Sequence, residues 1–268
     1  MKRKSGVADD KPDEDGAQGT ISRKLLSLTG DAFLLDVDGT ILDIAVSPED
    51  VRVPPSLHRT LALLIARSGG GVALVSGREI AALDRLFGPL ALAVVGCHGA
   101  EWRPEPAGPI VARAQPLSDD IRRSLLNLAA AEPRIRVEDK RYTIAFHYRH
   151  APDRGAALEE RLRRYLAPHS GELRLMRGKS VVEVKPLSFD KGEAIEALMQ
   201  LPVFAGRRPV FFGDDTTDED AFAAVHELHG VGISVGRNMA DAELMVPTPR
   251  VVRLSLARLV GCDTERVE

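Results

Sequence analysis

Acidic and hydroxyl side chains follow three separate apolar runs of the sequence, each at the point where the run ends. The apolar runs cover residues 32–35, 72–75 and 210–212. The polar residues that follow them are Asp36 and Asp38, then Ser76, then Asp214, Asp215 and Asp218. Because open α/β sheets bind ligands beyond the carboxyl ends of their strands, these segments are predicted to meet in one site. Carboxylates that share a small space repel one another, so we expect a cation there.

These residue types could hydrolyse a phosphate ester. Asp36 is predicted to attack phosphorus and to form an aspartyl-phosphate. Asp38 is predicted to protonate the leaving oxygen and then to take a proton from the hydrolytic water. Ser76 and Lys191 are predicted to bind the other phosphoryl oxygens and to stabilise the charge that spreads over them.

The same segments supply the expected metal ligands. We expect Asp36, Asp38 and Asp214 to hold Mg²⁺, which proteins typically bind through one or two carboxylates, substrate phosphate and waters. Asp215 and Asp218 are expected to orient metal-bound waters or the loop that carries the ligands.

Each segment also has a purely structural interpretation. Asp-x-Asp-Gly is a common turn, Ser76 could cap the helix that starts near Glu79, and residues 217–220 could form a helix N-cap with first-turn acids. Lys191 could be a surface lysine. However, a cation in the first turn opposes the helix dipole, which favours a bound anion nearby. The coincidence of three polar loops, each directly after an apolar run, favours catalysis.

The elements that must position these residues alternate along the chain. Further apolar runs cover residues 91–95 and 231–235, and helix-like stretches cover 55–67, 79–87, 191–200 and 218–225. Continuous apolar runs of this kind are typical of strands buried on both faces of a parallel sheet. We therefore predict an α/β core built on a doubly wound, Rossmann-like parallel sheet.

The middle of the chain has a different pattern. Residues 117–131 and 156–166 are helix candidates, residues 135–149 alternate between two faces, and residues 173–176 and 180–185 resemble two further strands. This pattern predicts an inserted α+β cap domain with one exposed sheet face. We assign residues 102–186 to the cap, residues 21–101 and 187–268 to the core, and residues 1–20 to a disordered tail.

The composition argues against some classes of binding partner. The 268 residues carry a net charge of −3 and only 4% aromatic residues, which argues against nucleic-acid binding. The two cysteines make no disulfide framework and suit a reducing compartment. No apolar run approaches the roughly 20 residues of a membrane span, and no secretory signal is evident. We expect a cytoplasmic monomer that acts on a small molecule, without membrane partners.

The chain resembles the haloacid dehalogenase superfamily of phosphatases in four motifs, which are carried by the segment 36–40, Ser76, Lys191 and the segment 213–215. More narrowly, it is similar to the trehalose-6-phosphate phosphatases in the segments 74–78, 98–101, 137–140, 147–149, 178–184 and 213–222. This resemblance covers roughly residues 30 to 260 in order. It implies Mg²⁺-dependent hydrolysis of trehalose 6-phosphate to trehalose and phosphate, the last step of trehalose biosynthesis, under a mobile cap.

The resemblance also implies a set of substrate-binding residues. Glu138, Lys140 and Glu183 would bind the sugar hydroxyls from the cap, and Gly77 and Arg78 would contact the substrate from the core. Carboxylates accept hydrogen bonds from vicinal hydroxyls, and a lysine donates to them. Without the family, these charges could equally be solvated strand-face residues.

Other interpretations stay open at this point. His98 could be either a ligand or a structural histidine at the hinge. Another capped phosphatase, acting on sucrose phosphate or mannosyl phosphoglycerate, would share the same motifs. A non-catalytic sugar-phosphate sensor or a receiver-like phosphoacceptor is a rival of another class. The presence of Asp36, Asp38, Ser76 and Lys191 together argues against that rival.

Overall fold

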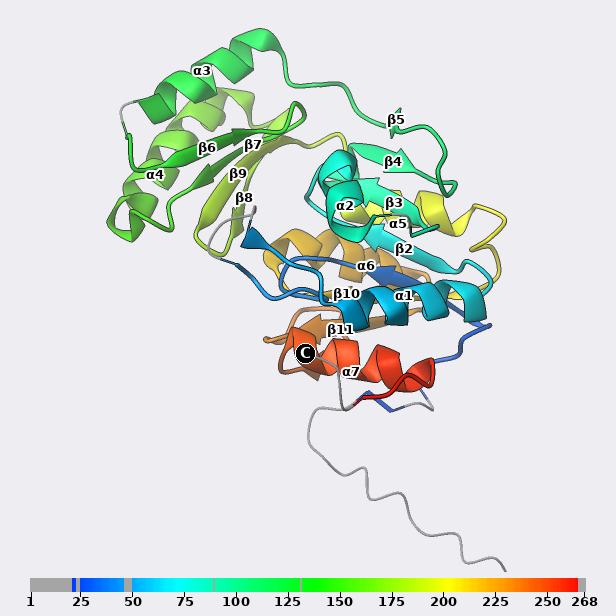
Figure 1. Ribbon diagram of the computed structural model, residues 1–268. Coiled ribbons are helices and arrows are strands. Elements are labelled where there is room, and N and C mark those ends of the chain that lie inside the picture. Colours follow the sequence, from blue (N-terminus) through cyan, green and yellow to red (C-terminus); the bar gives the residue numbers. More distant parts are fainter. Residues whose placement is uncertain (1–20, 23–24, 46–49, 89, 131, 265–268) are drawn as a thin grey trace, which may run out of the picture.

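Two sheets organise the protein, as a computed structural model shows for residues 21–22, 25–45, 50–88, 90–130 and 132–264. The tail predicted at residues 1–20 lies outside these described residues. One sheet has eight strands and the other has four, and each forms a separate unit with its own helices (Figure 1). The prediction of an α/β fold with a central parallel sheet is confirmed.

The eight-stranded sheet forms the core. From one edge to the other its strands are β12 (Leu244–Val246), β11 (Val231–Val235), β10 (Arg208–Gly213), β1 (Asp31–Leu35), β2 (Val72–Val75), β3 (Ala93–Gly96), β4 (Glu101–Arg103) and β5 (Val111–Ala112). The strands from β12 to β3 are parallel, whereas β4 and β5 run antiparallel to their neighbours. Chain order reverses between β10 and β1, so the switch point at which such sheets bind ligands lies there. β4 and β5 extend this sheet beyond residue 102, where we had predicted that the cap begins.

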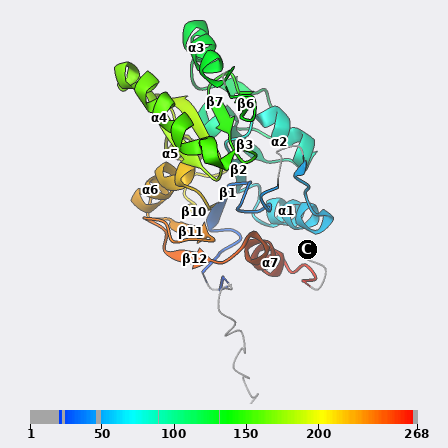
Figure 2. The same ribbon diagram turned by 90° about the vertical axis from the view of Figure 1, so that its left-hand side faces the viewer.

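Helices cover both faces of the large sheet (Figure 2). One face packs against α1 (Pro55–Arg67), α2 (Ile80–Phe87) and α7 (Pro249–Leu259), and the other against α5 (Lys191–Met199) and α6 (Glu219–Glu227). β1 is apolar at four consecutive positions because alternate side chains serve the two faces. Phe33 and Leu35 join the first cluster, whereas Ala32 and Leu34 join the second, and all four are fully buried.

The cap is an antiparallel sheet backed by two helices. Its strand order is β6 (Arg136–Asp139), β7 (Ile144–His147), β9 (Val181–Pro186) and β8 (Leu173–Gly178). α3 (Asp119–Ala130) and α4 (Gly155–Leu166) pack on one face through apolar side chains such as Leu125, Phe146 and Leu162. The alternation at residues 135–149 is a hairpin of two strands rather than one strand, because the chain turns at Arg141, where φ is +67°.

A short connection returns the chain from cap to core. Residues 187–190 join β9 to α5. The Lys185 ammonium, fully buried at the end of β9, donates a hydrogen bond to the Phe189 carbonyl and lies 4.3 Å from the centre of the Phe189 ring. These contacts hold the connection against the end of β9.

The chain also forms short 3₁₀ helices, which are η2 (Cys97–Gly99), η3 (Pro152–Arg154), η4 (Ala167–His169) and η5 (Thr216–Asp218). η2 directly follows β3, and η5 follows β10 after Asp214 and Asp215. Within the described part of the chain, no helix has the length and apolar character needed to cross a membrane.

Candidate active site

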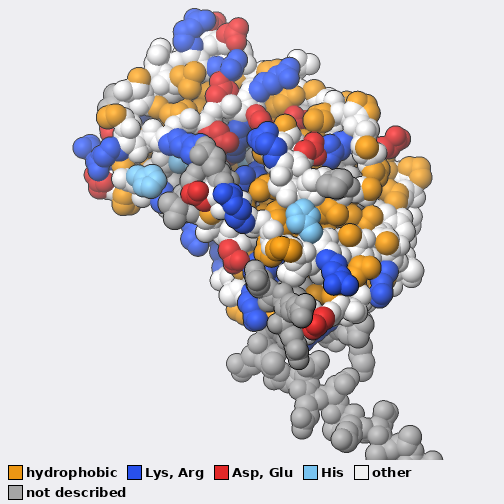
Figure 3. Space-filling view, in the orientation of Figure 1, with side chains coloured by type: hydrophobic (Ala, Val, Ile, Leu, Met, Phe, Trp, Pro, Cys, Tyr) orange, Lys and Arg blue, Asp and Glu red, His pale blue; other side chains and the backbone are white. Residues whose placement is uncertain are grey.

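A cavity of about 320 Å³ lies where the carboxyl ends of the core strands face the cap sheet. Such a volume is at the lower end of typical small-molecule pockets. Eleven of the predicted site residues line it: Asp36, Asp38, Ser76, Gly77, Arg78, Glu138, Lys140, Glu183, Lys191, Asp214 and Asp215. Asp218 does not line the cavity and lies buried behind it. Charged side chains of both signs gather where the two units meet (Figure 3).

Three carboxylates approach one another at the switch point of the core sheet. One ligand oxygen from each of Asp36, Asp214 and Asp218 lies within 4.8 Å of the other two. Burial raises the pKa of Asp36 to about 7, and burial together with the carboxylates of Asp36 and Asp218 raises the pKa of Asp214 to about 8. Ionised carboxylates at this range are costly unless a cation neutralises them. An all-oxygen donor set of this kind fits Mg²⁺.

Gly39 allows Asp214 to come this close to the first loop. Its φ is +86°, and a Cβ added there would lie 2.1 Å from Asp214 Oδ2. A residue with a side chain would therefore both strain the backbone and displace the carboxylate. Thr40 closes the same loop, because its hydroxyl donates to Asp36 Oδ2 at 2.9 Å. The Asp-Val-Asp-Gly-Thr segment thus shapes the carboxylate site through its turn as well as through its acids.

Lys191 is a buried residue of the site and not a surface lysine. It occupies the first turn of α5, whose N-cap Asp190 accepts a hydrogen bond from the Glu193 amide at 2.9 Å. Its ammonium lies 2.7 Å from Asp36 Oδ1 and 2.6 Å from Asp218 Oδ1. Burial opposes its charge, but the attraction of Asp218 and Asp36 outweighs burial and raises the pKa of Lys191 above its ordinary value. Lys191 therefore stays cationic at neutral pH.

Asp218 organises the loop that follows β10. Its Oδ2 accepts hydrogen bonds from the backbone amides of Asp214 and Asp215, at 3.0 and 3.1 Å. The Asp215 side chain in turn caps η5 by accepting from the Thr216 amide at 2.8 Å. The N-cap that we had considered for residues 217–220 is therefore displaced: the capping side chain is Asp215, and Asp218, the N-cap residue of α6, makes no side-chain cap there. The expected first-turn acids are present as Glu219 and Asp220.

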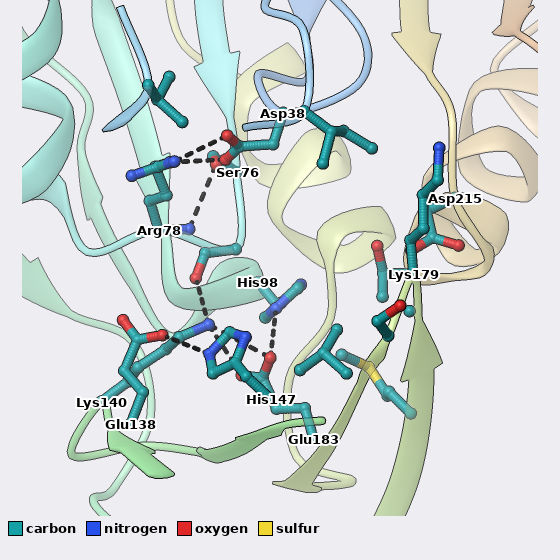
Figure 4. Close-up of a pocket in the computed structure, with 18 of the residues that line it drawn as sticks. Asp38, Ser76, Arg78, His98, Glu138, Lys140, His147, Lys179, Glu183 and Asp215 are labelled. Carbon is teal, nitrogen blue, oxygen red and sulfur yellow. Dashed lines mark hydrogen bonds and ion pairs between the residues drawn. The ribbon is translucent and has the colours of Figure 1, made fainter. Parts of the chain in front are cut away.

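Arg78 and Asp38 form a pair within the pocket. The Arg78 guanidinium donates to both oxygens of the Asp38 carboxylate, at 2.6 and 2.7 Å (Figure 4). We had predicted Asp38 as a metal ligand and Arg78 as a substrate contact. The structure instead engages the Asp38 carboxylate with Arg78, apart from the group formed by the other carboxylates.

Ser76 lines the same cavity as the Arg78–Asp38 pair and Asp36. It follows β2 and is buried, and its hydroxyl accepts a hydrogen bond from the Arg78 amide at 3.2 Å. It does not cap α2, whose first amide, that of Ile80, donates instead to Glu101 at 2.7 Å. The Ser76 hydroxyl keeps a proton to donate, and it faces the same pocket as Lys191.

The cap contributes a row of side chains from all four strands. In register across the sheet stand Glu138, Ala145, Glu183 and Met176. Three of the four line the cavity, whereas Ala145 is fully buried. The sheet face that we had expected to be exposed to solvent is therefore the face that covers the pocket.

Glu183 is the most heavily bonded carboxylate of the cap. Thr143 donates to its Oε1, and the Lys140 ammonium lies 3.2 Å from its Oε2 and also donates to the Gly77 carbonyl at 3.3 Å. His98 Nε2, from the core, lies 3.4 Å from Oε2. Burial alone would raise the pKa of Glu183, but Lys140 and His98 outweigh it and hold the pKa far below its ordinary value.

The side chain of Glu138, a second carboxylate from the cap, is more exposed to solvent than that of Glu183. Its side chain is 38% exposed, and Oε2 lies 2.9 Å from His147 Nε2. This hydrogen bond is the main cause that lowers the pKa of Glu138. Sequence reasoning did not single out His147 as a site residue. The two-residue spacing of Ala145 and His147 places both side chains on the same sheet face. This alternation could have indicated that His147 faces the pocket.

Comparison with known proteins agrees with this geometry. A family model described as trehalose-phosphatase matches residues 34–243. A probable trehalose-phosphate phosphatase of Sinorhizobium fredii is 38% identical over 231 residues, which is 85% of this chain and 87% of the relative. The trehalose-6-phosphate phosphatase of Escherichia coli is 39% identical over 212 residues, and the match covers 79% of each chain.

Solved structures show the same fold. The C-terminal domain of a C. albicans trehalose-6-phosphate phosphatase superimposes with a TM-score of 0.80 at 23% identity, covering 91% of this chain and 98% of that one. A trehalose-6-phosphate phosphatase related protein superimposes with a TM-score of 0.69 at 24% identity, covering 85% of this chain and 96% of that one. The family model and the curated relatives assign the chain to the phosphatases of the haloacid dehalogenase superfamily. Within that class, the chain belongs to the trehalose-phosphatase family, whose members are phosphoric monoester hydrolases.

Proposed function

We propose that this chain hydrolyses trehalose 6-phosphate to trehalose and phosphate, with Mg²⁺ and through a phosphorylated Asp36. The observation that carries the proposal is the juxtaposition of two groups in one cavity. Asp36, Lys191 and Asp214 face it from the core, and Glu138, Lys140 and Glu183 face it from the cap. A sugar phosphate would fit such a cavity, with its phosphate at the core residues and its hydroxyls at the cap residues.

The first step transfers the phosphoryl group to the core. A carboxylate oxygen of Asp36 attacks phosphorus, forming a new O–P bond while the bond from phosphorus to the sugar oxygen breaks. Asp38 gives a proton to that leaving oxygen, and trehalose is the first product. Lys191 and the Ser76 hydroxyl bind the other phosphoryl oxygens, where negative charge gathers in the transition state. Release of Asp38 from Arg78 precedes this step, since the ion pair favours the ionised carboxylate.

The second step regenerates the enzyme. A water molecule attacks phosphorus, Asp38 accepts a proton from it, and the bond between phosphorus and Asp36 breaks to release phosphate. Asp36 and Asp214 would hold the Mg²⁺, which supplies positive charge against the carboxylates and the phosphate. Asp218 accepts from the amides at the start of the Asp214 loop and so keeps that ligand in place.

The cap residues would provide substrate recognition. Glu138 is open enough to accept hydrogen bonds from sugar hydroxyls, and Lys140 can donate to them. Contact between cap and core over the bound ester would also exclude bulk water from the reacting phosphorus.

The deciding experiment measures phosphate release from trehalose 6-phosphate with purified protein. We expect turnover in Mg²⁺, loss of turnover in excess chelator, and recovery when Mg²⁺ is returned. Sucrose 6-phosphate, mannosyl phosphoglycerate and glucose 6-phosphate serve as comparison substrates. Equal kcat/KM values across this panel would contradict the trehalose assignment, and turnover that is insensitive to the chelator would contradict the metal.

A further inference from the structure

His98 belongs to the core but contacts a carboxylate of the cap. It lies in η2 directly after β3, and its Nε2 is 3.4 Å from Glu183 Oε2. Both side chains are only 8% exposed. In Figure 4, His98 stands between the loop that carries Ser76 and the Glu183 side chain. Of the three side chains that contact the Glu183 carboxylate among the described residues, His98 alone comes from the core.

The backbone holds His98 in an unusual conformation. The φ angles of Cys97 and His98 are +49° and +56°, a region that residues other than glycine rarely occupy. Two backbone hydrogen bonds to the Ser76 loop fix it: the His98 amide donates to the Ser76 carbonyl at 3.0 Å, and the Cys97 amide donates to the Arg78 carbonyl at 2.9 Å. Strained backbone of this kind persists where the surrounding structure enforces it and often marks a functional site.

The imidazole ring is also confined. A Cβ added at Gly77 would lie 2.3 Å from His98 Cε1, so the glycine leaves the space that the ring fills. His98 Nδ1 is buried and has no hydrogen-bond partner among the described residues. Because burial lowers the pKa of His98, the ring carries one N–H at neutral pH. That proton lies on Nε2, the nitrogen that faces an acceptor, which leaves Nδ1 as a bare acceptor.

We infer that His98 is a positioning residue, which sets the orientation of the Glu183 carboxylate relative to the phosphate-binding loop when cap and core meet. The inference rests on the proposed function, because Glu183 is there assigned to the sugar end of the substrate. His98 contacts Ser76 only through its backbone amide, and among the described residues its imidazole makes no hydrogen bond with the Ser76 hydroxyl, with Lys191 or with the carboxylate cluster. Its contribution is therefore expected for substrates that need the cap and not for small aryl phosphates.

Two substitutions separate a positioning role from a space-filling one. Gln places its amide nitrogen near the position of the histidine Nε2, whereas the Asn amide ends near Nδ1 and cannot reach Glu183. The experiment compares the 268-residue wild type with its His98→Gln and His98→Asn variants in saturating Mg²⁺, on trehalose 6-phosphate and on p-nitrophenyl phosphate. His229→Asn is the matched control, since His229 is an exposed core residue with the same left-handed backbone, φ +55°.

We expect His98→Asn to lower kcat/KM for trehalose 6-phosphate about tenfold or more, mainly through KM, as for loss of a hydrogen bond to a charged group. His98→Gln should recover to within about threefold of wild type, and p-nitrophenyl phosphate should change less than about twofold in either variant. In a Glu183→Gln background, His98→Asn should add little further loss, because the two residues act as one unit.

Several results would overturn the inference. These are equal losses on both substrates, no loss in His98→Asn, or a His98→Gln variant as impaired as His98→Asn. Thermal melting is recorded for each variant, and if His98→Asn does not fold, His98→Gln alone decides through its activity on trehalose 6-phosphate. A wild-type enzyme that releases no phosphate from trehalose 6-phosphate would instead refute the proposed function.

Discussion

The guanidinium of Arg78 holds the carboxylate of Asp38 at two points, Nε to Oδ2 at 2.6 Å and Nη2 to Oδ1 at 2.7 Å. Paired planar groups of this kind fix orientation as well as charge. The pair joins the loop after β1 to the loop after β2, on the side of the pocket that faces the cap. In the proposed mechanism, Arg78 would therefore set the orientation from which the Asp38 carboxylate begins each cycle.

Arg78→Lys should lower kcat/KM for trehalose 6-phosphate by roughly 10- to 100-fold, because lysine offers a point charge and cannot make the two-point contact. Steady-state kinetics on the purified variant measures this effect. Arg123→Lys is the matched control, since Arg123 is 70% exposed on α3 and should show wild-type kinetics. An Arg78→Lys enzyme with unchanged kinetics would mean that orientation of Asp38 does not matter.

Asp36→Asn should abolish turnover, because an amide is a poor nucleophile and a poor Mg²⁺ ligand. A reduction of at least about 10⁴-fold in kcat is expected. Phosphate release is measured beside Asp120→Asn, a change at a 91% exposed carboxylate of α3 that should leave kcat intact. Substantial activity in the purified Asp36→Asn protein would contradict its role as nucleophile.

Glu183→Gln should impair both the sugar site and the fold. Lys140, whose side chain is 11% exposed, would lose the negative charge that balances it. Breaking a buried ion pair in this way costs about 3–5 kcal/mol, and partial exposure places this case at or below the lower end. Urea unfolding gives the stability, and KM for trehalose 6-phosphate gives the effect on binding.

The control for Glu183→Gln is Glu160→Gln on α4, a side chain that is 63% exposed. It should change neither quantity, since surface ion pairs contribute little. If Glu183→Gln reduces turnover of p-nitrophenyl phosphate as much as that of trehalose 6-phosphate, Glu183 is a structural residue and not a sugar ligand.

Stability should respond to pH through Lys185. Burial lowers the pKa of Lys185 to about 8 from its ordinary 10.5. Between these values the unfolded chain binds a proton that the folded chain has lost, so the free energy of unfolding rises with pH. The slope from this residue is at most about 1.4 kcal/mol per pH unit. Urea unfolding at several pH values between 8 and 10 should show the slope in wild type and its reduction in Lys185→Met; identical slopes would contradict the shift.

Much of the fold could be predicted from the apolar pattern. β1, β2, β10 and β11 lie within two residues of the predicted runs, because strands buried on both faces leave uninterrupted apolar segments. α7 escaped prediction although Pro249 begins it, since no chemistry-bearing residue drew attention to the C-terminal segment. The hairpin turn at Arg141 was missed because side-chain alternation resumes on its far side, so the pattern carries no sign of the reversal.

The sequence predicted which residues meet in the site better than it predicted the contacts that each of them makes there. Strand ends that are distant in sequence had to converge at the switch point of a parallel sheet, which placed Asp36, Ser76 and Asp214 together. The partner of each carboxylate could not be predicted in the same way. Whether Asp38 faces the carboxylate cluster or Arg78 depends on side-chain torsions within one loop, and residue spacing does not record them.

The connection between β9 and α5 limits the distance between Glu183 in the cap and Lys191 in the core. Glu183 lies within β9, which ends at Pro186, and Lys191 begins α5 after the connection of residues 187–190. The buried Lys185 near the end of β9 binds the Phe189 carbonyl of that connection. Under the proposed function, Glu183 would bind the sugar and Lys191 the phosphate, so this short connection would fix the distance between the two ends of the bound substrate. A phosphate ester that is shorter or longer than the natural substrate could then not reach both ends of the site. Its phosphorus would lie out of reach of Asp36 even when all of its sugar hydroxyls are hydrogen-bonded to the cap.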